Sequence, residues 1–281
     1  MTMQVVVTRP AREAVTWVST LSAAGFDPVA LPLLAFGTPT HADPLNAVRA
    51  GLAGFDAVMF VSPQAVYAFL DENFDQNSAS SQSHVDFIAI NDDLKRGPLR
   101  CWAPGPGTAQ ALVRVGVPLA HIDQPAPDAA QFDSEALWSV VASQVVPGTR
   151  VLVVRGELDA SAGPLADGRG SGREWLADQC RAAGATVQMC AAYKRQMPRW
   201  TPGMCAAACA AATNGAVWLF SSSEGVTYLA KLVPGQRWGA AMALATHPRI
   251  AQAVSGLGFG QVHVCRPAQA EVLQTLHNWR N

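Results

Sequence analysis

The sequence predicts an α/β protein with open, doubly wound parallel sheets. Short apolar runs alternate with segments of helical spacing along the whole chain, and most connections between them are short. This alternation is typical of parallel sheets that carry helices on both faces. Two of the runs, DAVMFVS (56–62) and TRVLVVRGE (149–157), are largely apolar, as expected of strands buried between two helical layers. Sheets of this class bind ligands at the carboxyl ends of their strands.

The predicted elements follow one another from the first residues onward. QVVVT (4–8) is a short β-rich run, Pro10 suits a first helical turn, and the helix over 11–24 stops at Gly25. A polar loop is predicted over 75–84, and a mobile Gly/Ala/Ser-rich segment over 158–172. The remaining extended segments and helices are predicted over 26–36, 44–53, 56–62, 63–72, 86–90, 99–104, 108–115, 133–144, 149–157, 173–183, 185–193, 202–213, 216–221, 223–232, 241–246, 248–256, 261–265 and 268–279.

The composition argues against several classes of protein. The chain has 281 residues, with 20 Lys and Arg against 21 Asp and Glu. This balance gives no electrostatic footprint for nucleic acid, although a local cleft can still be basic enough for an anionic ligand. No apolar run approaches the roughly 20 residues of a membrane helix. The start MTMQVVVTRP lacks the pattern of a signal peptide, so a soluble cytoplasmic protein is expected.

Neither the cysteines nor the histidines are spaced as a metal site. Cys205 and Cys209 stand four residues apart in a predicted helix, but no matching pair of His or Cys is nearby. Free thiols are therefore expected at these positions. The six histidines show no HxxxH or HExxH spacing, so no metal is expected.

Two pairs of segments resemble each other and occur in the same order. VMFVSPQAVYAF (58–69) aligns without a gap with WLFSSSEGVTYL (218–229). GPGTAQALVRVGV (105–117) aligns in the same way with HPRIAQAVSGLGF (247–259). Both pairs together predict two similar domains within the chain.

The N-terminal strand–helix–strand has no second copy directly after it, so the first domain is expected to be discontinuous. It would comprise residues 1–36 and 194–281, with a second domain inserted over 40–190. The chain would then cross between the domains near 33–39 and near 191–198. Both crossings are extended and contain proline, and they are suited to pair as a two-stranded β connector.

The segment WAPGPGTAQALVRVGV (102–117) resembles the strand–turn–helix of a nucleotide-binding protein. It joins a strand-like run to a helix through Gly and Pro. A phosphate cradle, an ordinary strand-to-helix turn and another anion-binding helix start all fit it. The absence of a complete GxGxxG or a Walker lysine argues against a nucleotide-dependent transferase. A receiver-type regulatory domain would need acidic residues clustered at strand ends, which the sequence also lacks.

A series of short motifs runs through the whole chain in a distinctive order. These are VTRP (7–10), FVSPQAV (60–66), a Gly-x-x-Thr-Ala turn (105–109), SEALW (134–138), VLVVRGE (151–157) and GATVQMCAAYKR (184–195). Each motif is short and degenerate, and the specificity lies in their order and spacing. Together, from Val6 to the final helix, they make a chain that resembles the uroporphyrinogen-III synthase family of tetrapyrrole biosynthesis.

The resemblance implies a fold and an activity. The fold is two flavodoxin-like domains joined by a two-stranded β connector, and the family's enzymes act as monomers without cofactor or metal. The implied reaction closes the linear tetrapyrrole hydroxymethylbilane, with inversion of ring D through a spiro intermediate and loss of water. Its product is uroporphyrinogen III, the precursor of haem, sirohaem and corrinoids. A transient hand-over of the substrate from hydroxymethylbilane synthase is also implied.

The implied substrate is a polycarboxylate, so an interdomain cleft rich in hydrogen-bond donors is expected. Helix N-termini offer free N–H groups and positive dipole ends. Arg9, Arg155 and Arg249 follow predicted strands and are expected to bond carboxylates, the alternative being solvated surface charges. The other residues expected to bind substrate at these strand and helix ends are Ser62, Pro63, Gly105, Thr108, Gly156, Ser222, Ser223 and His247.

Tyr193, in the AAYKR motif, matches the family tyrosine proposed to help the hydroxyl group of the substrate depart. The resemblance thus implies a general acid at this position, and the alternative is an aromatic side chain that packs in the connector. Thr108 and Ser62 match polar positions that face the family's cleft. Both are also suited to cap helices, a role that is compatible with binding.

The sequence departs from the family pattern in two places. Ile250 stands at the Thr-like position of the second turn, so either function does not need that hydroxyl or His247 and Arg249 replace it. Segment 158–172 is longer than the family's Gly-Gly-Arg linker and is expected at the rim of the cleft. The competing interpretation is a non-catalytic, two-lobed protein that binds a small anionic ligand. Its periplasmic members would need an export signal, which the sequence lacks.

Overall fold

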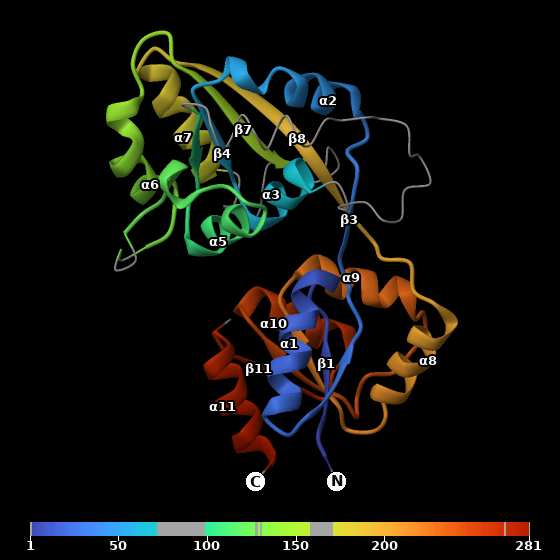
Figure 1. Cartoon of the computed structure of the whole chain (residues 1–281). Helices are drawn as coiled ribbons and strands as arrows, with labels where there is room; N and C mark the ends of the chain where they lie inside the picture. The colour runs from blue at the N-terminus through green and yellow to red at the C-terminus, as the bar shows by residue number, and fades with distance from the viewer. Residues whose placement is uncertain are drawn as a thin grey trace. The chain divides into compact units, whose positions relative to one another are not determined.

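The structure is a computed structural model that describes residues 2–71, 99–126, 129, 131–157, 171–266 and 268–280. The chain divides into two compact units, Met1–Ala35 with Gln196–Asn281, and Phe36–Arg195 (Figure 1). The predicted polar loop 75–84, the predicted strand 86–90 and most of the predicted insertion 158–172 lie outside the described residues.

The discontinuous unit, called unit 1 below, contains a five-stranded sheet in the order β11-β10-β9-β1-β2. Its strands pair parallel throughout. Numbered within the unit, this order is 2-1-3-4-5, which is the flavodoxin-like arrangement of a doubly wound sheet. The elements of unit 1 are β1 (Gln4–Val7), α1 (Ala11–Ala23), β2 (Asp27–Ala30), α8 (Pro202–Ala211), β9 (Val217–Phe220), α9 (Ser223–Leu232), β10 (Met242–Ala245), α10 (Pro248–Leu257), β11 (Gln261–Val264) and α11 (Gln269–Arg280).

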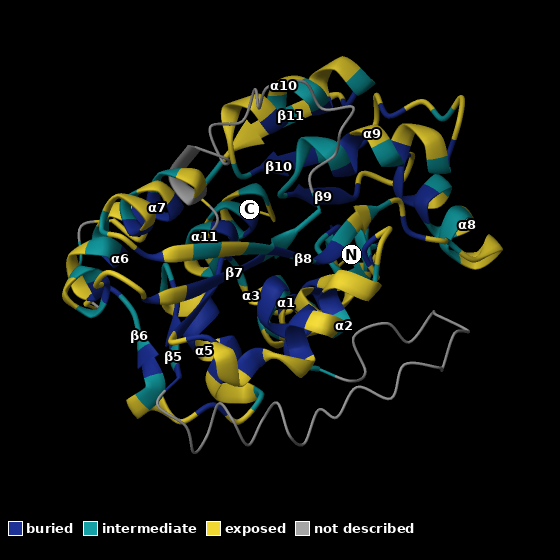
Figure 2. Ribbon diagram, turned by 90° about the horizontal axis from the view of Figure 1, so that it is seen from above, coloured by how far each residue is buried: buried dark blue, intermediate teal, exposed yellow. Residues whose placement is uncertain are grey.

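The two faces of this sheet are covered by different helices. Val5 and Val7 of β1 belong to one core cluster with Trp17 of α1 and Leu276 of α11. Val6, between them, belongs to a second cluster with residues of α8, α9 and α10. Alternate residues of a strand point to opposite faces, so helices on both sides require β1 to be apolar throughout. Figure 2 shows the same burial along β9 and β10, with exposed residues on the outer side of α10.

The continuous unit, called unit 2, contains a six-stranded sheet in the order β3-β8-β7-β4-β5-β6. Strands β8, β7, β4, β5 and β6 pair parallel, and one continuous core cluster packs around them. The elements of unit 2 are β3 (Ala35–Gly37), α2 (Asp43–Ala50), β4 (Ala57–Phe60), α3 (Pro63–Leu70), β5 (Arg100–Trp102), α5 (Pro106–Arg114), β6 (Ile122–Asp123), α6 (Ser134–Val141), β7 (Arg150–Gly156), α7 (Ser171–Ala182) and β8 (Thr186–Gln196), with short 3-10 turns between some of them.

The two sheets correspond strand by strand. Met59 of β4 lies opposite Val153 of β7, just as Leu219 of β9 lies opposite Val7 of β1. Strands β7, β8, β4, β5 and β6 therefore take the places of β1, β2, β9, β10 and β11. The same fold is entered at a different strand in each unit, so the two units are circular permutations of each other. The sequence pairs found by alignment fall on equivalent elements, β4–α3 with β9–α9 and α5 with α10.

The chain passes between the units through two extended segments. Strand β3 contains the division between Ala35 and Phe36, and the end of β8 contains the division between Arg195 and Gln196. These two strands are neighbours in one sheet, which is the two-stranded connection expected from the sequence. Strand β8 is longer than predicted because it continues through this connection to Gln196.

Candidate functional site

Two helices, α3 and α5, begin at the carboxyl edge of the unit 2 sheet. Ser62 is the N-cap of α3, and its Oγ accepts a hydrogen bond of 3.2 Å from the backbone N–H of Ala65. Pro63 is the first helical residue, where its missing N–H costs no hydrogen bond. Gly105 is the N-cap of α5 and supplies no capping side chain. No side-chain oxygen therefore caps the start of α5.

Thr108 lies inside the first turn of α5 and does not cap the helix. The residue is only 4% exposed. Its backbone N–H bonds the carbonyl of Gly105 at 3.1 Å. A hydroxyl group on the first turn, beside a helix N-terminus, is well placed to donate to an anion.

Tyr193, Ser62 and Gly156 come together at the same edge. The hydroxyl of Tyr193 lies 3.4 Å from Ser62 Oγ, and the residue is only 3% exposed. Gly156, at the end of β7, pairs with Tyr193 of β8, and a Cβ placed on Gly156 would lie 2.9 Å from the ring atoms Cε2 and Cζ. The ring of Phe36 on β3 meets the tyrosine edge-on, with centroids 5.3 Å apart. Three separate segments thus place one buried phenol at this edge.

Arg155 and Glu157 flank Gly156. Arg155 belongs to β7, within the strand predicted over 149–157. It is partly exposed and forms no hydrogen bond or ion pair with the described residues. Glu157 is occupied, because its Oε2 accepts bonds from the backbone N–H and the hydroxyl of Thr40, at 2.9 and 3.1 Å. Arg155 is therefore an available cation beside the Tyr193 cluster, while Glu157 ties β7 to the segment before α2.

At the equivalent edge of the unit 1 sheet, Arg9 and Ser222 already form contacts with other residues of unit 1. Arg9, the counterpart of Arg155 in the strand register, bonds Glu13 at 3.2 Å and lies over the ring of Trp17 at 4.7 Å. Ser222 caps α9 by accepting the N–H of Gly225 at 3.4 Å. Ser223 Oγ is buried and has no hydrogen-bond partner in the described part of the chain.

A side chain caps the start of α10, whereas no side chain caps the start of α5. His247 is the N-cap of α10, and its Nδ1 accepts the N–H of Arg249 at 3.1 Å. Arg249 lies in the first turn of α10, within the helix predicted over 248–256. Ile250, at the place of Thr108, is 5% exposed and belongs to the core of unit 1. The residue that departs from the family pattern therefore serves packing.

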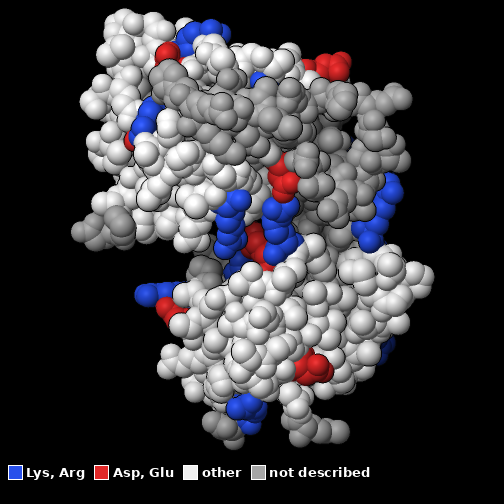
Figure 3. Space-filling view, in the orientation of Figure 1, with Lys and Arg blue, Asp and Glu red and all other residues white. Residues whose placement is uncertain are grey.

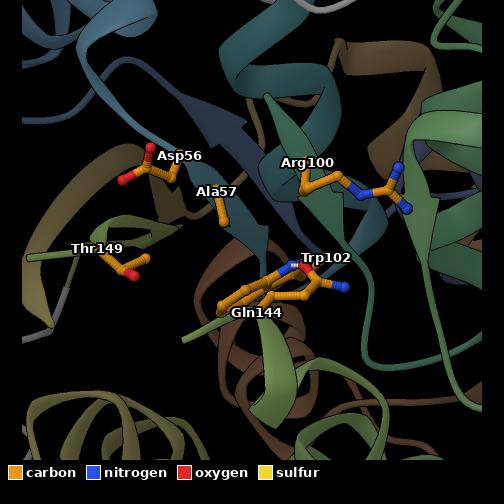
Figure 4. A pocket seen from close by; sticks show the side chains of 6 residues that line it. All are labelled: Asp56, Ala57, Arg100, Trp102, Gln144 and Thr149. Atoms are coloured by element: carbon orange, nitrogen blue, oxygen red, sulfur yellow. Dashed lines mark hydrogen bonds between the residues drawn. The ribbon is translucent and has the colours of Figure 1, made fainter. Parts of the chain in front are cut away.

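A pocket of about 380 Å³ lies at the opposite, amino-terminal edge of the unit 2 sheet (Figure 4). Its polar side chains already have internal partners. The indole Nε1 of Trp102 donates to Gln144 Oε1 at 3.1 Å, and Arg100 forms two bonds of 2.9 and 2.6 Å to the carboxylate of Asp123. In Figure 4 the Arg100 guanidinium points away from Asp56. These contacts stabilise the sheet edge, and the predicted site residues lie elsewhere.

Charged side chains of both signs are present on the face drawn in Figure 3, within a larger area of uncharged surface. Among the described residues, no helix is both long and apolar enough to cross a membrane.

All six cysteines are free thiols. Cys205 and Cys209, on α8, are partly exposed. Burial raises the pKa of Cys101 to about 12 and the pKa of Cys180 and Cys190 to about 11. Within the described residues, no group of three His, Cys, Asp or Glu is arranged to hold a metal ion.

Alkylation by iodoacetamide at pH 8 is expected to modify Cys205 and Cys209 and to spare Cys101, Cys180 and Cys190. The reaction needs an accessible thiolate. Cys101, Cys180 and Cys190 are buried, and their raised pKa values keep them protonated at this pH. Peptide mass spectrometry of native and urea-unfolded protein measures this pattern. Rapid modification of Cys190 in the native protein would contradict it.

The same thiols predict a loss of stability in alkali. In the unfolded chain thiols ionise near pH ~8.5, whereas the folded chain holds these protons to higher pH because burial raises the pKa of Cys101, Cys180 and Cys190. Their contribution to stability is fully present below that pH and is lost as the pH rises toward the folded pKa values. The urea midpoint of unit 2 should therefore fall progressively above about pH 8.5.

Two aromatic residues at this edge were not found from the sequence. Phe36 is an apolar residue of the connector, and only the pairing of β3 with β8 brings it to Tyr193. Phe132 is 46% exposed and lies against the start of α5, where a Cβ on Gly105 would come within 3.1 Å of its own Cβ. Its one sequence signal is an apolar residue directly before the capping residue Asp133.

Two flavodoxin-like α/β units in one chain, with helix N-termini at the carboxyl edges of their sheets, define a protein class suited to an anionic small molecule. The chain matches the family model described as uroporphyrinogen-III synthase HemD over residues 15–273. It belongs to the uroporphyrinogen-III synthase family, and is thereby a cyclising hydro-lyase of tetrapyrrole biosynthesis.

Solved structures of the same family are similar to this chain. The uroporphyrinogen-III synthetase of Helicobacter pylori 26695 matches with a TM-score of 0.56 and 13% identity, covering 100% of both chains. A mutant uroporphyrinogen III synthase of the extremely thermophilic bacterium Thermus thermophilus matches with a TM-score of 0.45 and 15% identity, covering 99% of this chain and 97% of the other. The first of these supports the two-unit fold.

Proposed function

We propose that the chain closes hydroxymethylbilane to uroporphyrinogen III at the carboxyl edge of the unit 2 sheet, with Tyr193 as the general acid. The observation that carries this proposal is the buried phenol of Tyr193 beside the N-terminus of α3, 3.4 Å from Ser62 Oγ. A proton donor is needed at the point where the substrate loses its hydroxyl group, because a hydroxide ion is a poor leaving group. The phenol supplies that proton, and water departs to leave an azafulvene.

The helix starts hold the substrate during this step. The start of α5, which no side chain caps, and the hydroxyl of Thr108 bind a substrate carboxylate, and the start of α3 binds another through its backbone. Fixing the carboxylates on rigid helices restricts the conformations of the tetrapyrrole. Attack through the substituted carbon of ring D, which leads to inversion, is then selected by orientation.

Arg155 is expected to contribute to substrate binding more than its counterpart Arg9. Arg155 has no partner among the described residues, whereas Arg9 already bonds Glu13. Replacing Arg155 by Ala removes a charge-assisted hydrogen bond and should raise KM about tenfold, with little change in kcat. Arg9→Ala should raise KM less than about threefold. Steady-state kinetics of the two variants measure the difference, and equal effects would count against the assignment.

The activity itself is tested with hydroxymethylbilane generated enzymatically in the assay. The tetrapyrrole products are oxidised and the type I and type III isomers are separated by chromatography. Type III product in excess over the enzyme-free control supports the function. Formation of the type I isomer alone, which arises without enzyme, would overturn it, and tight binding of the bilane without turnover would favour a binding protein instead.

We also propose that the enzyme is a cytoplasmic monomer and receives its unstable substrate by transient contact with hydroxymethylbilane synthase. The monomer is supported by a fold in which each unit has its own buried core. Light scattering after size exclusion tests the mass. The hand-over is tested in an assay that couples the two enzymes in the presence of a protein that binds free bilane without converting it. Type III product that still forms at the same rate indicates direct transfer of the substrate.

A further inference from the structure

A one-residue irregularity lies where β7 and β8 carry the Tyr193 cluster. Along most of the ladder the registers advance together, so that Val154 pairs with Cys190 and Arg155 pairs with Ala191. The next pair joins Gly156 to Tyr193, which leaves Ala192 without an opposite residue. A shift of one residue exchanges the faces of a strand. The bulge therefore decides that the tyrosine, and not Ala192, stands opposite Gly156.

The ring of Tyr193 occupies the space that a side chain on Gly156 would need. A Cβ there would lie 2.9 Å from both Cε2 and Cζ and 3.2 Å from the phenol oxygen. Separations under 3 Å between such atoms force one partner to move. These contacts fall at the hydroxyl end of the ring, so the atoms displaced would include the one that carries the proton.

The hydrogen bond to Ser62 does not by itself fix the phenol. Its length of 3.4 Å is long for two hydroxyl groups. The firmer contacts are the ring of Phe36, which meets Tyr193 at 87°, and the backbone of Glu157, whose N–H donates to the Tyr193 carbonyl at 2.6 Å. The position of the hydroxyl is therefore set by packing around the ring and by the ladder at its backbone.

We propose that Gly156 is a positioning residue for catalysis: its bare Cα, brought opposite Tyr193 by the bulge, sets where the phenol proton meets the departing hydroxyl of the substrate. The proposal rests on the proposed function of Tyr193. It assigns to the glycine of the Arg-Gly-Glu motif a role through the tyrosine and not through contact with substrate.

Gly156→Ala is expected to lower kcat about ten- to hundredfold, because a misplacement of about 1 Å in a reacting group can cost that much. KM should change less than about threefold, since the carboxylate contacts at α3 and α5 are left in place. Gly256→Ala is the matched control. A Cβ on Gly256, in α10, meets nothing within 4 Å, so this variant should keep the wild-type kcat.

A double-mutant cycle separates positioning from a general loss of structure. In a Tyr193→Phe background the proton donor is already absent, so Gly156→Ala should lower kcat by less than about twofold further. Tyr193→Ala removes the obstructing ring, so Gly156→Ala should lower the melting temperature in the presence of Tyr193 and have little effect in the Tyr193→Ala background.

Three results bear on the proposal. Additive losses of kcat in the Tyr193→Phe cycle would overturn it, because Gly156 would then act independently of the phenol. Unchanged kcat in Gly156→Ala would also overturn it, while a low kcat in Tyr193→Phe would leave the proposed function standing. Absence of type III product with the wild-type protein would instead overturn the proposed function.

Discussion

Tyr193→Phe is expected to lower kcat about 100-fold while KM changes less than about threefold. A positioned general acid contributes roughly 10²–10⁴ to a rate, and the lower end applies here because hydroxymethylbilane also loses its hydroxyl group slowly in water. The ring that packs on Gly156 and Phe36 is retained in the variant. The fold should therefore be unchanged, and the loss should appear in the chemical step alone.

Tyr228→Phe provides the control for this variant. The hydroxyl of Tyr228 donates to Glu224 at 2.8 Å within helix α9, so this substitution also removes one phenol hydrogen bond. Its kcat should stay within about twofold of the wild type, in line with the modest net contribution of one such bond. Initial rates of type III formation with freshly generated bilane measure both variants. A Tyr193→Phe enzyme with wild-type kcat would remove the acid role of this tyrosine.

Arg49→Met is expected to lower the free energy of unfolding of unit 2 by about 3 kcal/mol. Arg49 lies on α2 and is only 9% exposed. Its Nε donates to the carbonyl of Phe69 at 3.1 Å and its Nη2 to that of Ala68 at 2.6 Å. These carbonyls belong to the last turn of α3, where helices leave acceptors unsatisfied. Methionine fills the space but leaves two buried acceptors without a donor.

Two variants keep this expectation specific. Burial lowers the pKa of Arg49 to about 10, so the residue stays charged near neutral pH and the loss should be the same at pH 6 and pH 8. Arg49→Lys keeps the charge without the planar fork and should cost less than Arg49→Met. Arg181→Met removes an exposed arginine paired with Asp178 and should change stability by less than about 0.5 kcal/mol. Urea unfolding measures all three variants. An Arg49→Met variant with an unchanged free energy of unfolding would refute the capping role.

The layout of the sheets could be predicted from sequence because it depends on local patterns. Apolar runs such as residues 57–60 and 217–220 are buried on both sides, and the alternation of strands with helices leaves few topologies. The aligned pairs of segments fall on equivalent elements of the two units, β4–α3 with β9–α9 and α5 with α10. Ser62 and Ser222 as helix caps also followed from short-range sequence rules.

The detail of the site could not be predicted because it depends on contacts between distant strands. The opposition of Gly156 and Tyr193 requires a one-residue bulge, and no local sequence rule gives its place. Thr108 resembled a cap, but Gly105 is the N-cap and the helix begins at Pro106, which leaves the threonine inside the first turn. The buried role of Arg49 depends on the end of α3 reaching α2, a tertiary contact between separate helices.

The permuted arrangement of the two units has a consequence for synthesis on the ribosome. Unit 2 is one continuous segment, so all of its strands are available as soon as that segment has emerged. In unit 1, strand β1 emerges long before its neighbour β9, although Val5 of β1 pairs with Val217 of β9. At ~5–20 residues per second, β1 waits about 10 to 40 s for this partner. During that time the edge of β1 that will pair with β9 is open to other chains. Prompt folding of unit 2, which is inserted between these two strands, brings their ends of the chain closer together and so shortens the loop that the pairing must close.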